Sequence, residues 1–167
     1  MSDRETWVDL DDYPGYAVSS WGRIMNTVTE LVKAPSVNRE GIASVNLIRD
    51  NRQCRRSVAR LVAGAFLEAP PKPSFDTPIN LDGDRLNNHA DNLMWRPLWF
   101  ARQYHTQLKS PVNPEWVGTV ELVQTGEIFE DVRECSTKYG LLEKEIILSA
   151  LTQNVVFPTY YEFRLVS

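Results

Sequence analysis

Residues 80–95 read Asn-Leu-Asp-Gly-Asp-Arg-Leu-Asn-Asn-His-Ala-Asp-Asn-Leu-Met-Trp, and this stretch decides the fold of the middle of the chain. Its Asp82-Gly83-Asp84 triplet is typical of a tight turn, because glycine tolerates positive φ and aspartate bonds to nearby backbone amides. We expect a short strand before this turn, near residues 77–81, and a helix after it, from about Asn88. Residues 98–108 have a second helical pattern.

The chain before this stretch has mainly the patterning of short strands. Four strand candidates are residues 17–20, 22–26, 31–37 and 42–49. We expect a hairpin tip at residues 49–52. The apolar period then becomes that of a helix over residues 56–66, with Ser57 as the N-terminal cap. The proline-rich residues 68–74 cannot continue this helix, so they predict a stiff linker.

The last part of the chain follows a second proline-containing linker at residues 110–114 and has its own pattern of elements. Strands are expected at residues 116–123, 128–129 and 160–166. Two short helices are expected at residues 131–139 and 143–151, with Gly140 as the C-terminal cap between them. Two short helices around a tight turn predict a helix-turn-helix.

Composition and charge restrict the class of protein. The chain has 167 residues and is 43% hydrophobic, as in globular proteins. No apolar run approaches the roughly 20 residues that span a membrane, and the acidic start is unlike a signal peptide. We therefore expect a cytoplasmic protein with no membrane partner. The two cysteines share no Cys-x-x-Cys spacing, which excludes a tetrahedral zinc ribbon.

The charge is unevenly distributed along the chain. The net charge is -4, which is unusual for a nucleic-acid binder. Residues 21–109, however, carry 13 Lys and Arg against eight Asp and Glu. Residues 1–20 carry one against five, and residues 110–167 carry four against nine. A basic middle between acidic flanks leaves a usable surface for nucleic acid.

Three segments, in this order, resemble the parts of phage and intron-encoded HNH homing endonucleases. Residues 13–24, Tyr-Pro-Gly-Tyr-Ala-Val-Ser-Ser-Trp-Gly-Arg-Ile, are similar to the "GYEVSNLGRV" opening of a nuclease-associated DNA-binding module, and residues 60–66 to its "HRLVAEAF" helix. Residues 80–95 are similar to the HNH motif "NHIDGNKTNNRVENLEW". Residues 121–166 resemble the modular C-terminal helix-turn-helix of these enzymes.

The resemblance implies an α+β fold with three modules. These are a β-rich DNA-binding module at residues 1–67, an HNH-like ββα-metal unit at residues 75–109, and a helix-turn-helix module with flanking short strands at residues 115–167.

The resemblance also implies where a nuclease site would lie, and it shows that key residues are missing. The family's histidine base stands two positions before the Asp-Gly pair, and a metal ligand precedes it. Here these positions are Asn80 and Ile79, and neither side chain can do that chemistry. The histidine of the "HRLVA" helix is replaced by Ala59. Asn88 and Asn92 of the motif are retained.

Catalysis and metal binding are therefore not expected. Asp82 and Asn92 are the residual metal candidates, although Asp82 and Asp84 are first of all turn residues and the asparagines first of all cap or cross-link the fold. Mg²⁺ or another divalent metal is implied only for an active enzyme. His89 could replace the lost base, but a solvent-facing histidine is the simpler interpretation, as it is for His105.

Arginines form the best candidate for a DNA surface. Five of them lie within twelve residues: Arg49, Arg52, Arg55, Arg56 and Arg60. A solvated charged face is the alternative to phosphate contact, which we prefer because arginine grips phosphate with two bonds. Arg85, Arg96 and Arg102 extend this set, whereas Trp95, Trp99 and Phe100 are expected in the core rather than stacked on bases.

The second helix of the last module offers polar groups for base edges. They are Lys144, Ser149, Thr152, Gln153 and Asn154. Glu143 and Glu145 would face phosphates unfavourably, so this acidic module is as compatible with a protein partner as with DNA.

Three functions follow from these observations. We prefer a double-stranded-DNA-binding accessory or regulatory factor, derived from a homing endonuclease and phage-encoded, that does not cleave. The first alternative is an active metal-dependent nicking enzyme. The second is a protein that binds a host or phage protein through its acidic modules.

Overall fold

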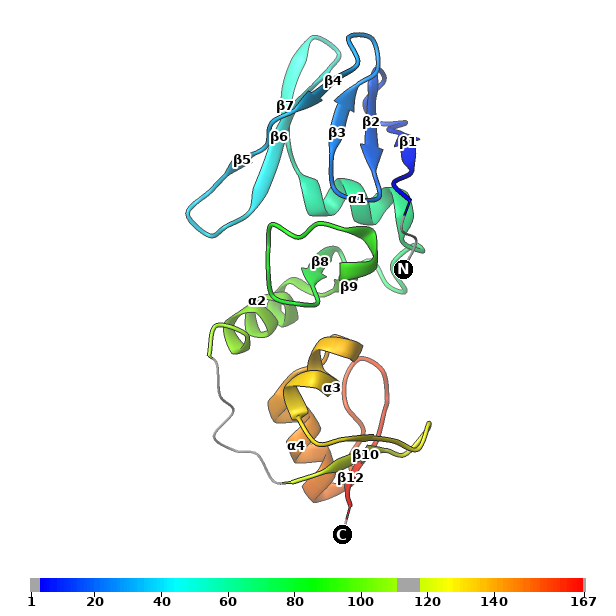
Figure 1. Cartoon of the computed structure of the whole chain (residues 1–167), viewed down its shortest axis with the longest axis vertical. Helices are drawn as coiled ribbons and strands as arrows, with labels where there is room; N and C mark the ends of the chain where they lie inside the picture. The colour runs from blue at the N-terminus through cyan, green and yellow to red at the C-terminus, as the bar shows by residue number, and fades with distance from the viewer. Residues whose placement is uncertain (1–3, 111–117, 167) are drawn as a thin grey trace. The chain divides into compact units, whose positions relative to one another are not determined.

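The computed structural model describes residues 4–110 and 118–166 (Figure 1). The chain divides into two compact units, residues 1–101 and 102–167, and each contains a hydrophobic core. The described residues combine four α-helices with several small sheets, in agreement with the predicted mixture of helix and strand. The predicted modules at residues 1–67 and 75–109 fall almost wholly in the first unit, and their boundaries stay a prediction.

The first sheet is a four-stranded antiparallel meander in the order β1-β2-β3-β4. Its strands are β1 (Trp7–Asp9), β2 (Tyr16–Ser19), β3 (Ile24–Asn26) and β4 (Leu31–Lys33). Every residue of β2 is buried, because β1 and β3 flank it and the core covers it. The predicted strand at residues 31–37 is interrupted after β4, where Pro35 lacks the N–H that a ladder needs.

The second sheet presents a long hairpin. Its strands are β5 (Ser36–Val37), β6 (Ala43–Arg49) and β7 (Arg52–Ser57), in that order. Asp50 and Asn51 connect β6 to β7 with φ of 51° and 59°, as a two-residue type I′ turn requires. The predicted hairpin tip is thereby confirmed.

Helix α1 (Val58–Phe66) follows β7 directly. The Ser57 side chain accepts a hydrogen bond from the Arg60 amide, which confirms the predicted cap. The helix begins two residues later than expected, because residues as far as Ser57 pair with β6. Val58, Val62 and Ala63 face the core of the first unit.

The middle stretch forms a ββα arrangement. Strands β8 (Thr77–Asn80) and β9 (Leu93–Arg96) pair antiparallel, and helix α2 (Leu98–Gln107) follows them as predicted. The helix expected from about Asn88 is wrong. The chain makes only the short 3₁₀ turn η1 (Ala90–Asn92) there, because Leu93 is buried opposite Asn80 and the following residues complete the ladder with β8.

The second unit contains a three-stranded sheet and a pair of helices. The sheet order is β11-β10-β12, with β10 (Val120–Leu122), β11 (Glu127–Phe129) and β12 (Phe163–Leu165). Helices α3 (Val132–Tyr139) and α4 (Glu143–Thr152) cover it, and Gly140 ends α3 with φ of 60°, as predicted. The assignment of this pair as a helix-turn-helix stays a prediction. The start of the predicted strand at residues 116–123, and most of the linker at 110–114, lie outside the described residues.

No helix within residues 4–110 and 118–166 combines the length and the apolar character needed to cross a bilayer.

Candidate functional site

The end of β8 and the loop that follows it hold the positions at which the HNH motif carries its base and its metal ligands. Asn80 is only 3% exposed. Its side-chain amide donates to the Asn87 carbonyl at 2.9 Å and to Asn88 Oδ1 at 3.1 Å. Asn88 is buried as well. The Asn80 side chain therefore ties the strand to its loop, and an amide has no basic nitrogen with which to activate water.

The Asp82 carboxylate accepts three hydrogen bonds from its own loop. Its carboxylate accepts from Asn92 Nδ2 at 2.9 Å, from Asn87 Nδ2 at 2.6 Å and from the Asp84 amide at 3.0 Å. The Asp82 amide in turn donates to Asn92 Oδ1 at 3.1 Å. The structure thus brings together the two residual metal candidates, Asp82 and Asn92, but binds them to each other.

This set of donors does not fit a divalent metal. Mg²⁺ requires several oxygen lone pairs directed at one point, about 2.0–2.1 Å away. The Asn92 amide nitrogen points at Asp82, and the position of the family's metal ligand is Ile79, which is fully buried. Among the described residues, no group of three or more His, Cys, Asp or Glu is placed to hold a metal. Hydrogen bonds, rather than a cation, close this loop.

His89 lies beside the loop but has a structural role. Its Nδ1 accepts a hydrogen bond from the Asp91 amide at 3.4 Å, which caps η1. Its ring lies 6.3 Å from that of Trp21, and the next residue, Ala90, donates its amide to the Ser20 carbonyl. A side chain at Gly22 would meet Asn88 at 3.0 Å, so the turn between β2 and β3 approaches this loop closely. The loop is docked on the first sheet.

The predicted arginines gather on the β6–β7 hairpin and at the start of α1. Arg49 and Arg52 face each other across the tip. Arg49 has weak ion pairs with Asp12 at 3.8 Å and Asp50 at 3.7 Å. The guanidinium of Arg52 is exposed and makes no hydrogen bond or ion pair with the part of the chain that the structure describes. The tip therefore presents one partly paired cation and one available cation.

Arg55 and Arg56 lie on opposite faces of β7 and are held in place. Arg55 donates to Ser44 Oγ at 3.0 Å and to Ser36 Oγ at 3.2 Å, across the three strands of the sheet. Arg56 lies over the Tyr13 ring at 5.4 Å. Both remain exposed, so their fixed geometry lowers the entropic cost of gripping a phosphate.

Two further polar residues share the outer face with Arg55. Asn46 lies directly opposite Arg55, and Gln53 lies opposite Ile48, two positions along the same face. Both are exposed, and their side chains make no hydrogen bond within the described residues. Neither residue was among those predicted from the sequence to contact DNA. The signal was present in the burial alternation of β6, because an inward-facing Val45 and Leu47 leave Asn46 facing outward.

The other two predicted arginines of this unit are partly engaged. Arg60 donates to the Asp76 carbonyl at 2.8 Å and lies 3.7 Å from its carboxylate. Arg85 donates to the Glu40 carbonyl at 3.1 Å, which ties the loop after β8 to the turn before β6. These contacts leave other guanidinium nitrogens of each residue for a phosphate.

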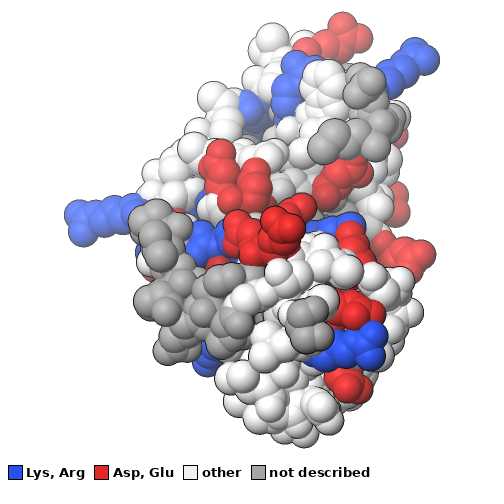
Figure 2. Space-filling view, turned by 60° about the horizontal axis from the view of Figure 1, so that its bottom comes forward, with Lys and Arg blue, Asp and Glu red and all other residues white. Residues whose placement is uncertain are grey.

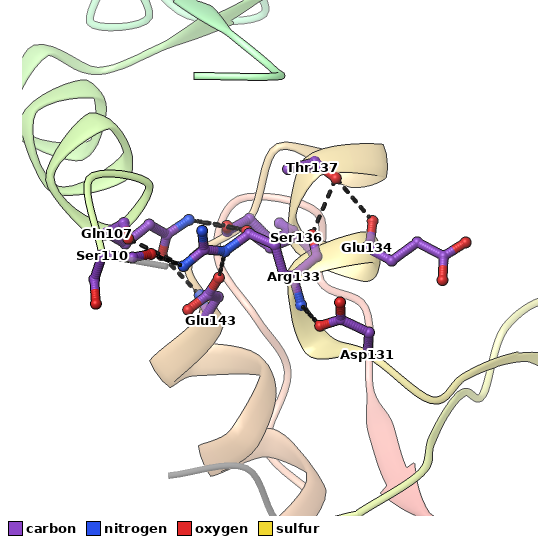
Figure 3. A network of polar contacts seen from close by, with 9 residues as sticks. Gln107, Ser110, Asp131, Arg133, Glu134, Ser136, Thr137 and Glu143 are labelled. Atoms are coloured by element: carbon purple, nitrogen blue, oxygen red, sulfur yellow. Dashed lines mark hydrogen bonds and ion pairs between the residues drawn. The ribbon is translucent and has the colours of Figure 1, made fainter. Parts of the chain in front are cut away.

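The first residue of α4, Glu143, belongs to a polar network and is not exposed (Figure 3). Glu143 is buried and forms an ion pair with Arg133. Arg133 also donates to the carbonyls of Gln107 at 3.1 Å and Ser110 at 2.8 Å. Gln107 accepts from the Glu143 amide at 2.9 Å and donates to Ser136 Oγ at 2.9 Å. The predicted unfavourable contact between Glu143 and phosphates does not arise, because the Glu143 carboxylate is buried in an ion pair with Arg133.

The predicted base-reading residues of α4 do not lie together. Ser149 is buried, accepts from the Phe163 amide and donates to the Asn154 carbonyl, so it cannot reach a base edge. Lys144 is exposed at the start of the helix. Gln153 is the left-handed C-cap at its end, and Asn154 donates to Thr152 Oγ1 at 3.0 Å.

Four further expectations can be compared with the structure. Phe100 is buried as predicted, but Trp99 is 52% exposed because its position on α2 turns away from the core. His105, expected at the surface, is buried next to Tyr104. Arg96 is buried over the Phe100 ring, so it does not extend the arginine set.

Sequence comparison connects this geometry to HNH endonucleases. The chain is 32% identical over 89 residues to the uncharacterized HNH endonuclease L245 of Acanthamoeba polyphaga mimivirus, covering 53% of this chain and 26% of that protein. It is 31% identical over 94 residues to L247 of the same virus, covering 54% and 23%. The chain thus spans about a quarter of the length of these relatives. No family model matches it.

Structural comparison agrees with this similarity. The HNH homing endonuclease I-HmuI, in a structure describing its DNA binding and cleavage, matches with a TM-score of 0.55 and 18% identity, over 95% of this chain and 97% of that chain. The chain is therefore similar in sequence to part of two HNH endonucleases and similar in fold to an HNH homing endonuclease.

Proposed function

We propose that this HNH homing endonuclease-like chain binds double-stranded DNA through the β6–β7 hairpin without cutting it, as an accessory or regulatory factor. One observation carries the proposal. At the position of the nuclease base, the buried Asn80 amide is bonded to Asn87 and Asn88, while the arginine-rich hairpin of the same unit faces outward. The chain thus has an arginine-rich hairpin for binding DNA, but it has Asn80 and Ile79 where the nuclease motif has its base and its metal ligand.

The hairpin has the shape and the charge for duplex DNA. A two-stranded antiparallel ribbon is narrow enough to enter the major groove. Arg52, Arg55 and Arg56 supply cations for phosphates, whereas Asn46 and Gln53 offer both a donor and an acceptor to adenine edges.

The absence of cleavage follows from the chemistry of the loop. Losing a general base typically costs about 10²–10⁴-fold in rate. Asn80 has no basic nitrogen, Ile79 has no ligand atom, and the remaining Asp82 carboxylate is occupied by three hydrogen bonds. His89 does not restore a base here, because its Nδ1 already accepts a backbone amide. The nuclease activity in the names of the relatives belongs to much longer proteins.

A nicking assay on supercoiled plasmid tests the proposal. We expect no conversion above background with Mg²⁺, Mn²⁺ or Ni²⁺, and no change in melting temperature when these ions or EDTA are added. Metal-dependent nicking that disappears in Asn92→Ala would overturn the proposal. The double variant Ile79→Asp/Asn80→His is the matched comparison, since it returns a ligand and a base to the loop and should raise nicking above that of the unmodified chain.

A further inference from the structure

An open groove lies between the C-terminal half of α2 and the start of α4, within the second unit. Its volume is about 420 Å³. Arg102 and Lys144 line it from the two helices, together with the polar side chains of Gln103 and Thr106 and the apolar Leu142. Glu143 also lines it, but the Arg133 guanidinium neutralises that carboxylate. The charge that the groove offers a ligand is therefore positive.

The other charges of the unit make this groove unusual. Three of its basic residues are committed to carboxylates, in the pairs Arg133–Glu143, Lys138–Glu127 and Arg164–Glu121. The hydrogen bond from Lys138 lowers the pKa of Glu127, so that pair stays charged at neutral pH. Arg102 and Lys144, by contrast, form no ion pair with any residue that the structure describes, and the same holds for Lys109, just after α2.

Carboxylates dominate the rest of this region. Residues 110–167 carry nine Asp and Glu against four Lys and Arg. Figure 2 shows acidic side chains gathered in several groups on the face that it presents, some of them beside basic side chains. An anionic polymer would be repelled from most of such a surface, so an anion that contacts this unit is directed to the groove.

A hydrogen-bond network joins the two helices that line the groove. Gln107 bonds to the Glu143 amide through Oε1 and to Ser136 Oγ and the Leu141 carbonyl through Nε2 (Figure 3). These bonds fix the end of α2 against the start of α4. Arg102 and Lys144 therefore come from two helix segments that are hydrogen-bonded to each other. Their side chains supply the attraction, because Gln107 already occupies the first amide of α4.

We propose that this groove binds a phosphodiester of duplex DNA between Arg102 and Lys144, with Gln103 and Thr106 as additional hydrogen-bonding groups. The proposal rests on the proposed function, because the first unit would bring the same polymer to the groove. In this proposal the second unit makes a phosphate contact that helps to position the DNA. Phosphate contacts fix register without reading sequence, so Lys144 acts here on the backbone and not on a base.

Salt titrations of the full chain on a fluorescent duplex of mixed sequence test this site. Arg102→Gln/Lys144→Gln should flatten the slope of log K against log salt by about 1.8, because each neutralised phosphate contributes about 0.9. The matched control is Lys138→Gln/Arg164→Gln, which removes the same charge from the same unit at residues already paired with carboxylates. The control should leave the slope unchanged within error. All four side chains are on the surface, and circular dichroism checks that each variant is folded.

The outcomes separate this inference from the proposed function. Equal slopes for both variants and the unmodified chain would overturn the groove while DNA binding stands. Equal flattening in the two variants would also overturn it, because the effect would then be one of net charge. Absence of salt-dependent binding by the unmodified chain would remove the proposed function itself, and the groove with it. Binding of poly-glutamate is measured with the same variants. If Arg102→Gln/Lys144→Gln loses poly-glutamate binding but keeps the DNA affinity of the unmodified chain, the phosphodiester site is overturned in favour of an acidic protein partner.

Discussion

The loop between β8 and β9 and the hairpin of β6 and β7 are both rich in hydrogen-bond donors, but they use them in opposite ways. In the loop, the amides of Asn80 and Asn92 end on acceptors of the same short segment. In the hairpin, the side chains of Asn46 and Gln53 face solvent. Asparagine is present in both regions. Whether it stabilises the fold or remains available to a ligand depends on the acceptors around it, and not on residue type.

The largest expected effect concerns the hairpin. Arg52→Ala/Arg55→Ala/Arg56→Ala should flatten the slope of log K against log salt by about two to three units, because each phosphate contributes about 0.9. Fluorescence anisotropy over a salt series measures this. The matched variant is Arg23→Ala/Lys33→Ala/Lys72→Ala, which removes the same charge from the same unit outside the hairpin. If the two triple variants behave alike, the hairpin is not the DNA surface.

An intermediate effect concerns the loop. Asn80→Ala should lower the free energy of unfolding by about 2 kcal/mol, since it leaves the buried side-chain oxygen Asn88 Oδ1 without the hydrogen bond from Asn80 Nδ2. Urea denaturation measures the change. Asn46→Ala is the control and should lie within about 0.5 kcal/mol of the unmodified chain, as expected for an exposed surface position. If both variants lower the free energy of unfolding equally, the hydrogen bonds of the Asn80 side chain contribute no more to stability than the exposed Asn46 side chain does.

The smallest expected effect concerns sequence preference. Asn46→Ala and Gln53→Ala should each relax selection at one position of a randomised duplex by about tenfold, near the low end of the roughly 1–3 kcal/mol that a bidentate base contact contributes. Selection and sequencing of bound duplexes measures this, with the salt slope as an internal reference. An unchanged preference in both variants would show that the hairpin contacts only phosphates.

The sequence by itself determined the features that depend on neighbouring residues. The Ser57 cap, the Asp50-Asn51 turn, the Gly140 helix end and helix α2 were all predictable, because turn and cap chemistry acts over a few residues. The departure from the HNH motif at Asn80 and Ile79 could also be seen in the sequence, since it required only the motif resemblance.

The tertiary structure alone decided which polar groups are satisfied and which are available. The segment after Asn88 did not form a helix, because pairing with β8 across the loop outweighs local preference. Arg96 and His105 became buried and Trp99 exposed through the direction in which β9 and α2 face the core. Glu143 forms its ion pair with Arg133, ten residues away, and Gln53 lies opposite Ile48 only because of the strand register. Such contacts join residues that are far apart in the sequence, so no local pattern predicts them. The hydrogen-bond donors can be identified from the sequence, but only the fold determines which acceptors they meet.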